Sequence, residues 1–290
     1  MAIDFNAIHD TDWLACTDTD GVTYKVSGAN FKKLFPEPKT VPWEITTTTP
    51  NFKYYPFFVL SGENPITINW GDGSPKETIT QTGVYPVISH TYSTPGTYSL
   101  TGTSKGPFCV SGGYAADVWA SAEIVTSVGP PEAGHKLPPN CNYLNSKFKK
   151  IVDTTWSFIA DFDFSDVENL MLGFTQCTTM ESFPFVSLPN CTNFNQAWFK
   201  NDHLEDFPAN MFDACPINIS ASPFVFVFYN CALTSQSIEN VLASLDTNGA
   251  SNCQLNIDSG SNAEKTTWTP AANTAYDNLT TKGWTILYNA

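Results

Sequence analysis

The chain has 290 residues, which allows about one to three domains. Its 28 acidic and 14 basic residues give a formal net charge of −14 and a pI near 4.5. Binding to a phosphate backbone requires clustered Lys and Arg, so this charge argues against nucleic acid as a partner. The 21 Phe and 8 Trp exclude a disordered chain, and the abundance of Thr, Ser, Asn, Gly and Pro favours a turn-rich protein, mainly β with some α.

Targeting signals and cysteines point to a cytosolic product. Residues 1–10 contain neither the basic nor the apolar stretch of a secretory signal, and the apolar run at 224–229 is far shorter than the roughly 20 residues of a membrane helix. We therefore expect no export signal and no membrane insertion. The eight cysteines form no C-x-x-C pair, which argues against a zinc ribbon. A disulfide ladder and buried free thiols both remain open, and a reducing cytosol favours the thiols.

The N-terminal segment, residues 1–40, contains a predicted β-hairpin. Asp20-Gly21 is a turn signal, and alternating strand residues follow it at Val22, Tyr24 and Val26. The acidic residues nearby do not fit an EF-hand loop, because Cys and Ser would occupy two positions that require carboxylates. After the hairpin, a stiff linker is predicted from three prolines, Pro36, Pro38 and Pro42.

The same segment resembles the short N-terminal module shared by many tailed-phage virion proteins. The resemblance rests on Asp10-Thr11-Asp12, on the stretch Gly21-Val22-Thr23-Tyr24-Lys25-Val26-Ser27-Gly28-Ala29, and on Phe31 where that module has Leu. It implies attachment to another virion component. The residues expected to make that anchor are Asp12, Trp13, Tyr24 and Val26.

The second segment, residues 41–126, has the pattern of an antiparallel β-domain. Ile66, Ile68 and Trp70 alternate with polar residues, as in a half-buried strand, and Gly71-Asp72-Gly73 supplies a tight turn with positive φ at the glycines. Pro95-Gly96 predicts a type II turn before another strand.

These motifs resemble the PKD-type β-sandwich. The resemblance is carried by W-G-D-G-S at Trp70 to Ser74, H-T-Y at His90 to Tyr92 and P-G-T-Y at Pro95 to Tyr98. The less regular stretch from Ser104 to Ser127 suggests a truncated module. Asp72 and His90 could be a catalytic or metal-binding pair, but in this pattern we expect them to join two loops by hydrogen bonds.

The third segment, residues 127–290, contains an internal repeat. Met180-Glu181-Ser182-Phe183-Pro184 recurs 24 residues later as Leu204-Glu205-Asp206-Phe207-Pro208, and Phe174 recurs as Trp198. A further copy is stretched by six residues and places Phe228 and Cys231 at the positions of Phe174 and Cys177. Asn201 replaces the repeated cysteine in the middle copy, which weakens the disulfide interpretation. A period of this length predicts a short leucine-rich-repeat solenoid.

The end of the chain predicts a cap of helices and strands. An amphipathic helix is expected from the spacing of Ile238, Val241, Leu242 and Leu245, and it should end near Gly249. A strand is expected at 253–257, a second helix should start at Thr269-Pro270, and residues 284–288 should form a final edge strand.

The repeat resembles the BspA-like surface leucine-rich repeats. These share the unit F-x-x-C followed by Leu or Met, present here at Phe174 to Met180 and at Phe228 to Leu233. A PKD-like module before such repeats is a familiar order, and the closing segment is similar to that of many phage-encoded versions. The resemblance implies a surface-displayed adhesion protein.

Residues that could carry chemistry are few. The sequence contains no G-x-S-x-G, H-E-x-x-H or phosphate-binding loop, so we expect no catalytic residue, no cofactor and no metal site. Asp161, Asp163 and Asp166 alternate with Phe, which indicates acids facing water and rings facing the core. Weak candidates for stacking on sugar rings at the surface are Trp156, Trp198 and Trp268, and the repeat position of Trp198 favours the core instead.

Three functions are compatible with these patterns. The first is a non-enzymatic phage virion protein, assembled in the host cytoplasm, with a tail fibre or tail appendage as the first location and a head fibre or capsid decoration as the second. The second is a bacterial surface adhesin, which should begin with an export signal. The third is a polysaccharide-degrading tailspike, which we expect to fail because the sequence shows no paired acids across a cleft. The expected partners are other virion proteins, a host-surface polysaccharide or protein, and further copies of the chain in a homo-oligomer, with a trimer expected first.

Overall fold

The computed structural model describes residues 13–17, 23–27, 38–60, 64–80, 88–111, 123–141, 144, 146–217 and 222–290. Of the described residues, 27% lie in strands and 15% in helices, so the chain is mainly β with some α, as predicted. The chain divides into two compact units, residues 1–38 and 39–290. Within the described ranges, no helix has the length and apolar character needed to cross a membrane.

The first unit contains an antiparallel pair of strands. Strand β1 (Trp13–Thr17) pairs with β2 (Thr23–Ser27), and Thr17 lies opposite Thr23. This pairing confirms the predicted hairpin. The predicted turn residues Asp20-Gly21 lie outside the described residues.

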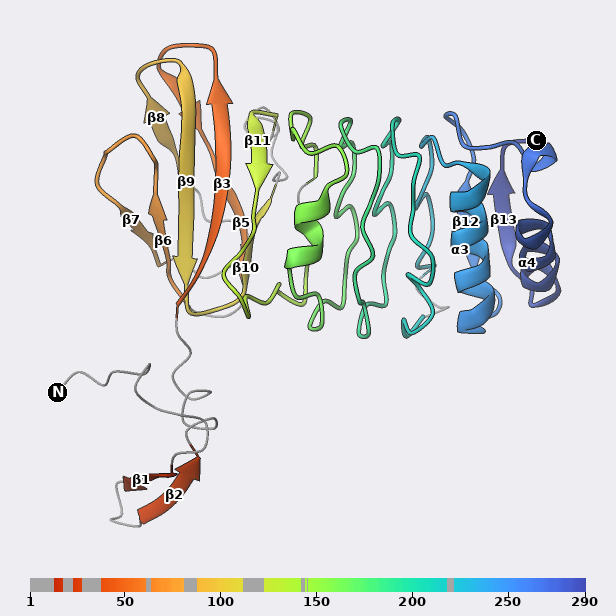
Figure 1. Ribbon diagram of the computed structural model, residues 1–290, viewed down its shortest axis with the longest axis horizontal. Helices are drawn as coiled ribbons and strands as arrows, with labels where there is room; N and C mark the ends of the chain where they lie inside the picture. Colours follow the sequence, from red (N-terminus) through yellow and green to blue (C-terminus); the bar gives the residue numbers. More distant parts are fainter. Residues whose placement is uncertain are drawn as a thin grey trace. The chain divides into compact units, whose positions relative to one another are not determined.

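The second unit begins with antiparallel sheets (Figure 1). One sheet has the strand order β11-β3-β9-β6-β7. Its strands are β3 (Lys39–Thr47), β6 (Ile66–Asn69), β7 (Glu77–Ile79), β9 (Gly96–Ser104) and β11 (Val125–Val128). Two further pairs join β4 (Phe52–Tyr54) to β8 (His90–Tyr92) and β5 (Phe57–Leu60) to β10 (Phe108–Ser111).

The side-chain alternation predicted for β6 is confirmed. Ile66 and Ile68 are fully buried and Trp70 is nearly so, whereas Thr67 and Asn69 are only half-buried. The buried face contributes to one core with the other strands. Within that core, the indole N–H of Trp43 donates to the hydroxyl of Tyr54 at 3.1 Å, so both polar groups are satisfied without water.

The prediction that Pro42 belongs to a linker is wrong, whereas Pro36 lies outside the described residues. Pro42 lies inside β3, opposite Thr101 of β9. The carbonyl of Pro42 accepts a hydrogen bond from Gly129, so the nitrogen of Pro42 also points away from β9. Proline therefore removes no hydrogen bond between β3 and β9, and the strand tolerates it.

The predicted type II turn at Pro95-Gly96 is wrong. Gly96 is the first residue of β9, pairs with Thr47, and does not have a positive φ. The chain bends just before it, where the hydroxyl of Tyr98 donates to the carbonyl of Thr94 at 2.7 Å.

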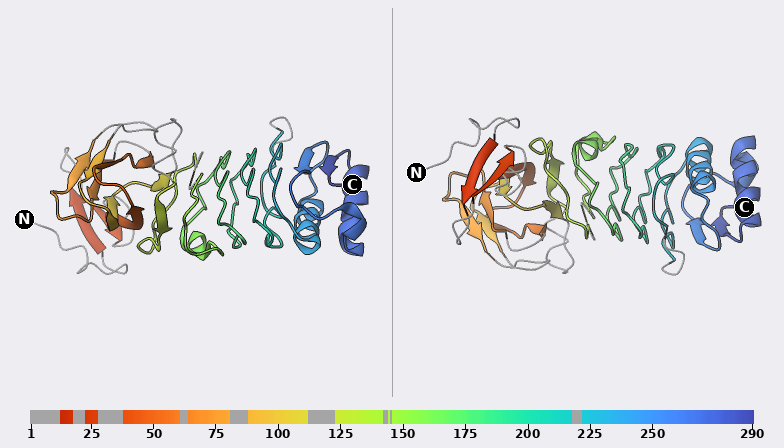
Figure 2. Two further views of the ribbon diagram at one scale, coloured as in Figure 1. Left: turned by 90° about the horizontal axis from the view of Figure 1, so that it is seen from above. Right: turned by 90° about the horizontal axis from the view of Figure 1, so that it is seen from below.

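The rest of the second unit consists of stacked turns of backbone that lie side by side in each view (Figures 1 and 2). The N–H of Leu170 donates to the carbonyl of Asn193 at 2.9 Å, and the N–H of Phe194 donates to that of Pro223 at 2.9 Å. These bonds recur at every second residue from 170 to 176 and from 194 to 200. We call residues 170–176, 194–200 and 224–230 the ladder segments. Their backbones run parallel, one above the other.

Left-handed residues recur at the same places in these turns. The φ angles of Leu172, Gln196 and Phe226 are 58°, 57° and 55°. A second column of such residues consists of Lys147, Gln176, Lys200, Asn230 and Ser259. None of them is glycine, so the repeated hydrogen bonds and packing must offset the cost of this conformation at each position.

Aromatic rings stack along the inside of the turns. The ring of Phe174 lies 5.9 Å from that of Trp198 at 18°, and Trp198 lies 5.3 Å from Phe228 at 14°. All three side chains are fully buried. The alignment predicted from sequence, with one period of 24 residues and the next six residues longer, therefore describes the packing of this core.

The C-terminal elements follow the prediction closely. Helix α3 (Ser235–Asn248) ends at Gly249, whose φ is 82°, and helix α4 (Pro270–Thr281) starts after Thr269, whose side chain accepts the N–H of Ala272. Strand β12 (Gln254–Ile257) pairs in parallel with β13 (Thr285–Tyr288). The 3₁₀ turn η4 (Lys265–Thr267) precedes α4 in this region, and a second 3₁₀ turn, η2 (Ser157–Asp161), lies earlier in the chain.

Candidate functional site

The tryptophans proposed from sequence as surface ligands lie in the core. Trp156 and Trp198 are 0% exposed and Trp268 is 6% exposed. The surface-stacking prediction is therefore wrong for Trp156 and Trp198, because both rings are packed inside the turns. The indole N–H of Trp268 donates to the carbonyl of Ala263 at 2.9 Å, and its ring packs against Tyr276 and Tyr288. Trp268 is therefore part of the packing of the C-terminal elements.

Three of the four predicted anchor residues lie on the two strands of the first unit. Trp13 belongs to β1, and Tyr24 and Val26 belong to β2. Asp12 lies outside the described residues. The anchoring role of these four residues stays a prediction.

Asp72 and His90 are joined by a hydrogen bond, as predicted, although His90 is the first residue of strand β8 and does not lie in a loop. Asp72 Oδ2 lies 2.7 Å from His90 Nε2, and Asp72 Oδ1 accepts the N–H and the hydroxyl of Ser74 at 3.0 and 2.6 Å. Partial burial raises the pKa of Asp72, but the hydrogen bonds from Ser74 and His90 outweigh it and lower the pKa to about 2. The ring of His90 also stacks on Trp70 at 4.6 Å, which fixes its orientation.

The acidic cluster at 161–166 has the predicted alternation. Phe162 and Phe164 are buried, Asp161 is exposed, and Asp163 and Asp166 are half-buried. Asp163 accepts the N–H of Ser165 at 2.8 Å, and Asp166 pairs with Lys136 at 2.9 Å. In the described ranges, no group of three or more His, Cys, Asp or Glu side chains is arranged to hold a metal ion.

The seven described cysteines are buried free thiols, and this confirms that interpretation for them. Burial raises the pKa of Cys191, Cys215 and Cys231 to about 12, so these thiols stay protonated at neutral pH. Cys16 lies outside the described side chains.

An exposed aromatic cluster on the ladder segments was missed by sequence reasoning. It consists of Phe199, Phe226 and Tyr229, which we call the aromatic corner. Phe199 stacks on Tyr229 at 5.6 Å and 16°, and Phe226 lies edge-to-face with both rings, 6.3 Å from Phe199 and 5.5 Å from Tyr229. Phe226 is 40% exposed, while Phe199 and Tyr229 are half-buried. Aromatic surface of this kind is enriched where proteins bind other molecules.

The aromatic corner arises from two neighbouring turns. Phe199 and Tyr229 occupy one repeat position, and Phe226 occupies the outward position that holds Gln196 one turn earlier. The ammonium of Lys200 lies 5.1 Å from the centre of the Phe199 ring. The preceding turn carries Leu172 and Thr175 at these positions, so the aromatic corner is confined to the later two turns.

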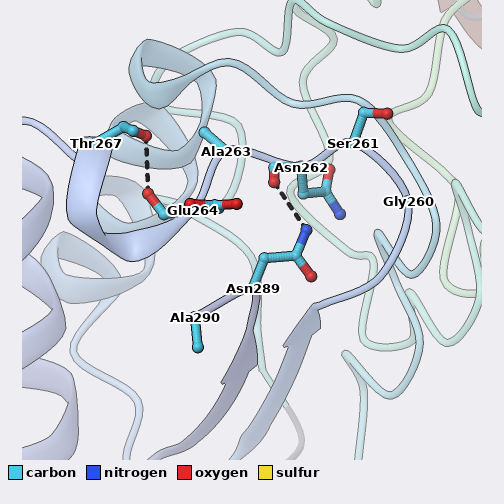
Figure 3. A pocket seen from close by; sticks show the side chains of 8 residues that line it. All are labelled: Gly260, Ser261, Asn262, Ala263, Glu264, Thr267, Asn289 and Ala290. Carbon is cyan, nitrogen blue, oxygen red and sulfur yellow. Dashed lines mark hydrogen bonds between the residues drawn. The ribbon is translucent and has the colours of Figure 1, made fainter.

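An open pocket of about 500 Å³ lies at the C-terminal end of the second unit (Figure 3). Several of its polar groups already bond to the protein. The amide nitrogen of Asn289 donates to the carbonyl of Asn262 at 2.8 Å, and the hydroxyl of Thr267 donates to the carbonyl of Glu264 at 2.7 Å. We therefore rank the aromatic corner above this pocket as the candidate interaction surface.

Comparisons of the chain with protein-family models, curated proteins and solved structures found no match. The fold and the candidate surface define a mainly β protein whose stacked turns expose an aromatic cluster. Its function is therefore argued from these residues and from the sequence motifs.

Proposed function

We propose that this chain is a non-enzymatic structural protein of a phage particle, which displays adhesion modules to the host surface. A tail fibre or tail appendage is the first location, and a capsid-attached head fibre or decoration protein is the second. The proposal rests on the division of the chain into two compact units. The hairpin whose sequence resembles phage virion modules belongs to a compact unit of its own, separate from residues 39–290.

The proposal also includes a more specific fold for each part of the second unit. We assign the antiparallel sheets to a PKD-like β-sandwich, supported by the Asp72–His90 contact and the turn glycines Gly71 and Gly73, whose φ angles are 78° and 84°. We assign the stacked turns to a short leucine-rich-repeat solenoid with a C-terminal cap of α3, β12, α4 and β13. The parallel backbone ladder and the buried Phe, Trp, Cys and Leu positions that recur in it support this assignment.

Adhesion is assigned to the second unit and anchoring to the first. The aromatic corner offers exposed rings on a surface held by repeated hydrogen bonds, which is a suitable contact for a host-surface molecule. In the acidic cluster at 161–166, two of the three acids make local contacts, Asp163 with Ser165 and Asp166 with Lys136. The expected assembly is a homo-oligomer, with a trimer first, attached to other virion proteins within the particle.

Competition for host adsorption tests the adhesion role. Saturating amounts of the purified chain, added to host cells before the phage, should reduce the rate at which particles adsorb. Unchanged adsorption, with no binding of the labelled chain to the cells, would contradict the proposal. Host polysaccharide incubated with the chain should keep its length, and shortened chains would support the tailspike alternative instead.

A further inference from the structure

We infer that the aromatic corner is a binding site for a neutral glycan chain. This inference rests on the proposed adhesion function and specifies the class of receptor and the residues that contact it. It is argued from three features of the surface: the geometry of the rings, the free polar groups around them, and the charge of the ladder segments.

The rings offer two kinds of surface at one place. Phe199 and Tyr229 are stacked along the direction in which the turns repeat, and Phe226 stands nearly perpendicular to Tyr229, at 89°. Phe226 is the most exposed of the three. An exposed ring beside two half-buried rings suits a sugar ring, whose C–H groups pack on an aromatic face while its hydroxyls point outward.

Polar groups without a hydrogen-bond partner among the described residues lie in the same ladder segments as these rings. The side-chain amides of Gln196 and Asn230 and the hydroxyl of Tyr229 make no hydrogen bond to any described residue. Gln196 lies in the turn next to Phe226, because its N–H donates to the carbonyl of Val225 at 3.0 Å. Amides and a phenol each provide both donors and acceptors, which is what sugar hydroxyls require.

The charge of the surface selects against an acidic glycan. Lys200 is the one charged side chain in the ladder segments, and its ammonium already lies over the Phe199 ring. The next turn carries the half-buried carboxylate of Asp258 at the repeat position of Phe199 and Tyr229, where it would repel an anion. The chain as a whole has a formal net charge of −14, which repels a polyanion at long range. A neutral glycan is not repelled by either of these negative charges.

Binding of the full-length chain to immobilised glycans tests the inference. The probes are neutral glucans, galactans and mannans, with sialylated and uronic-acid glycans beside them. We expect at least one neutral probe to bind. Phe226→Gln and Tyr229→Thr should each weaken that binding roughly tenfold, because each removes a ring.

The variants are chosen to preserve the fold. Each introduces the residue that an earlier turn carries at the same position, and Gln196 shows that Gln adopts the left-handed backbone required at Phe226. Leu172→Gln makes the same kind of change outside the aromatic corner and should leave binding unchanged. Thermal unfolding of all three variants should match the parent chain within a few degrees.

Several results would overturn the inference. These are no binding to any neutral probe, binding to acidic probes alone, or binding that Phe226→Gln and Tyr229→Thr leave unchanged in folded protein. The glycan result is also separable from the virion proposal. A chain that is found in phage particles but binds no glycan defeats this inference alone, and a glycan-binding chain absent from particles defeats the proposed function alone.

Discussion

The side-chain oxygen of Asn201 accepts the backbone N–H of Cys177 at 2.7 Å, across one turn of the stack. Asn201 is fully buried and occupies the position that cysteine holds in the neighbouring turns, at Cys177 and Cys231. The departure from the repeat is therefore a structural feature. An amide replaces a thiol at a place where the adjacent backbone needs an acceptor.

Asn201→Ala should destabilise the fold by about 1–3 kcal/mol, because it leaves the buried N–H of Cys177 without a partner. Equilibrium unfolding in urea measures the change. Asn195→Ala is the matched control in the same turn, since the buried side-chain oxygen of Asn195 has no hydrogen-bond partner among the described residues. It should alter stability by less than about 0.5 kcal/mol, and equal losses in the two variants would refute the explanation.

Replacing either of two glycines in one turn by alanine should destabilise the fold, but by very different amounts. Both have positive φ, but a Cβ on Gly71 would overlap the carbonyl oxygen of Ser99, whereas a Cβ on Gly73 would meet nothing within 4 Å. Gly73→Ala should cost about 1 kcal/mol for the backbone conformation alone. Gly71→Ala should cost about 3 kcal/mol or more, because the neighbouring strand must shift. Urea unfolding of both variants distinguishes them, and similar losses would show that the clash is relieved without cost.

The buried thiols should be unreactive and unpaired. In a Cys16→Ser chain, a thiol reagent at pH 8 should label almost nothing until the protein is unfolded, and seven thiols should then react. A reducing agent should leave the unfolding midpoint unchanged. A disulfide would show itself as a loss of about 2–5 kcal/mol on reduction.

Because Asp72 contacts His90, the stability of the fold should depend on pH in the acid range. The pKa of Asp72 is lowered from 3.8 to about 2, so the ionised form favours the fold; its contribution is complete above 3.8 and is lost as the pH falls to about 2. Asp72→Asn should cost about 1 kcal/mol near pH 6, a modest value because the group is partly solvated. The difference from the parent chain should vanish near pH 2, and a difference that persists there would contradict the assignment.

His135 lies where the β-domain meets the stacked turns. Its titration should affect the stability of the fold in a higher pH range than that of Asp72. Its Nε2 lies 2.5 Å from the carbonyl of Phe108, and its ring packs edge-on to Phe108 and Phe162. Burial lowers the pKa of His135 below its usual 6.5, although the Phe108 carbonyl and Glu132 partly oppose this and Lys39 reinforces it. The neutral form therefore favours the fold, and its contribution is complete above 6.5 and lost as the pH falls further.

His135→Gln keeps a donor and removes the titration, so the loss of stability between pH 7 and 5 should become shallower than in the parent chain. Chemical unfolding at a series of pH values measures it. An unchanged slope would show that other groups cause the acid sensitivity.

Local patterns in the sequence were sufficient for much of the fold. The alternation of Ile66 and Ile68 predicts β6, and the capping pair Thr269-Pro270 marks the start of α4, because these signals act within a few residues. Pro42 was misplaced because its tolerance in β3 depends on which side of the strand its nitrogen faces. That side is decided by pairing with Thr101, a partner far away in sequence.

The candidate site was harder to predict for the same reason. Phe199 and Tyr229 are 30 residues apart and meet only when two turns stack. Phe226 is exposed and has a left-handed backbone with a φ of 55°, a conformation that a non-glycine sequence does not signal. Within the run at 224–229, hydrophobicity alone could not separate the buried Phe224 from the exposed Phe226.

Antibody labelling of purified phage particles, viewed by electron microscopy, tests the central claim most directly. An antibody raised against residues 139–290 should label the tail, in agreement with a tail appendage that contacts the host. Label over the head would favour the head-fibre or decoration alternative. Particles without label, and without peptides of this chain by mass spectrometry, would contradict the proposal that it is a virion protein.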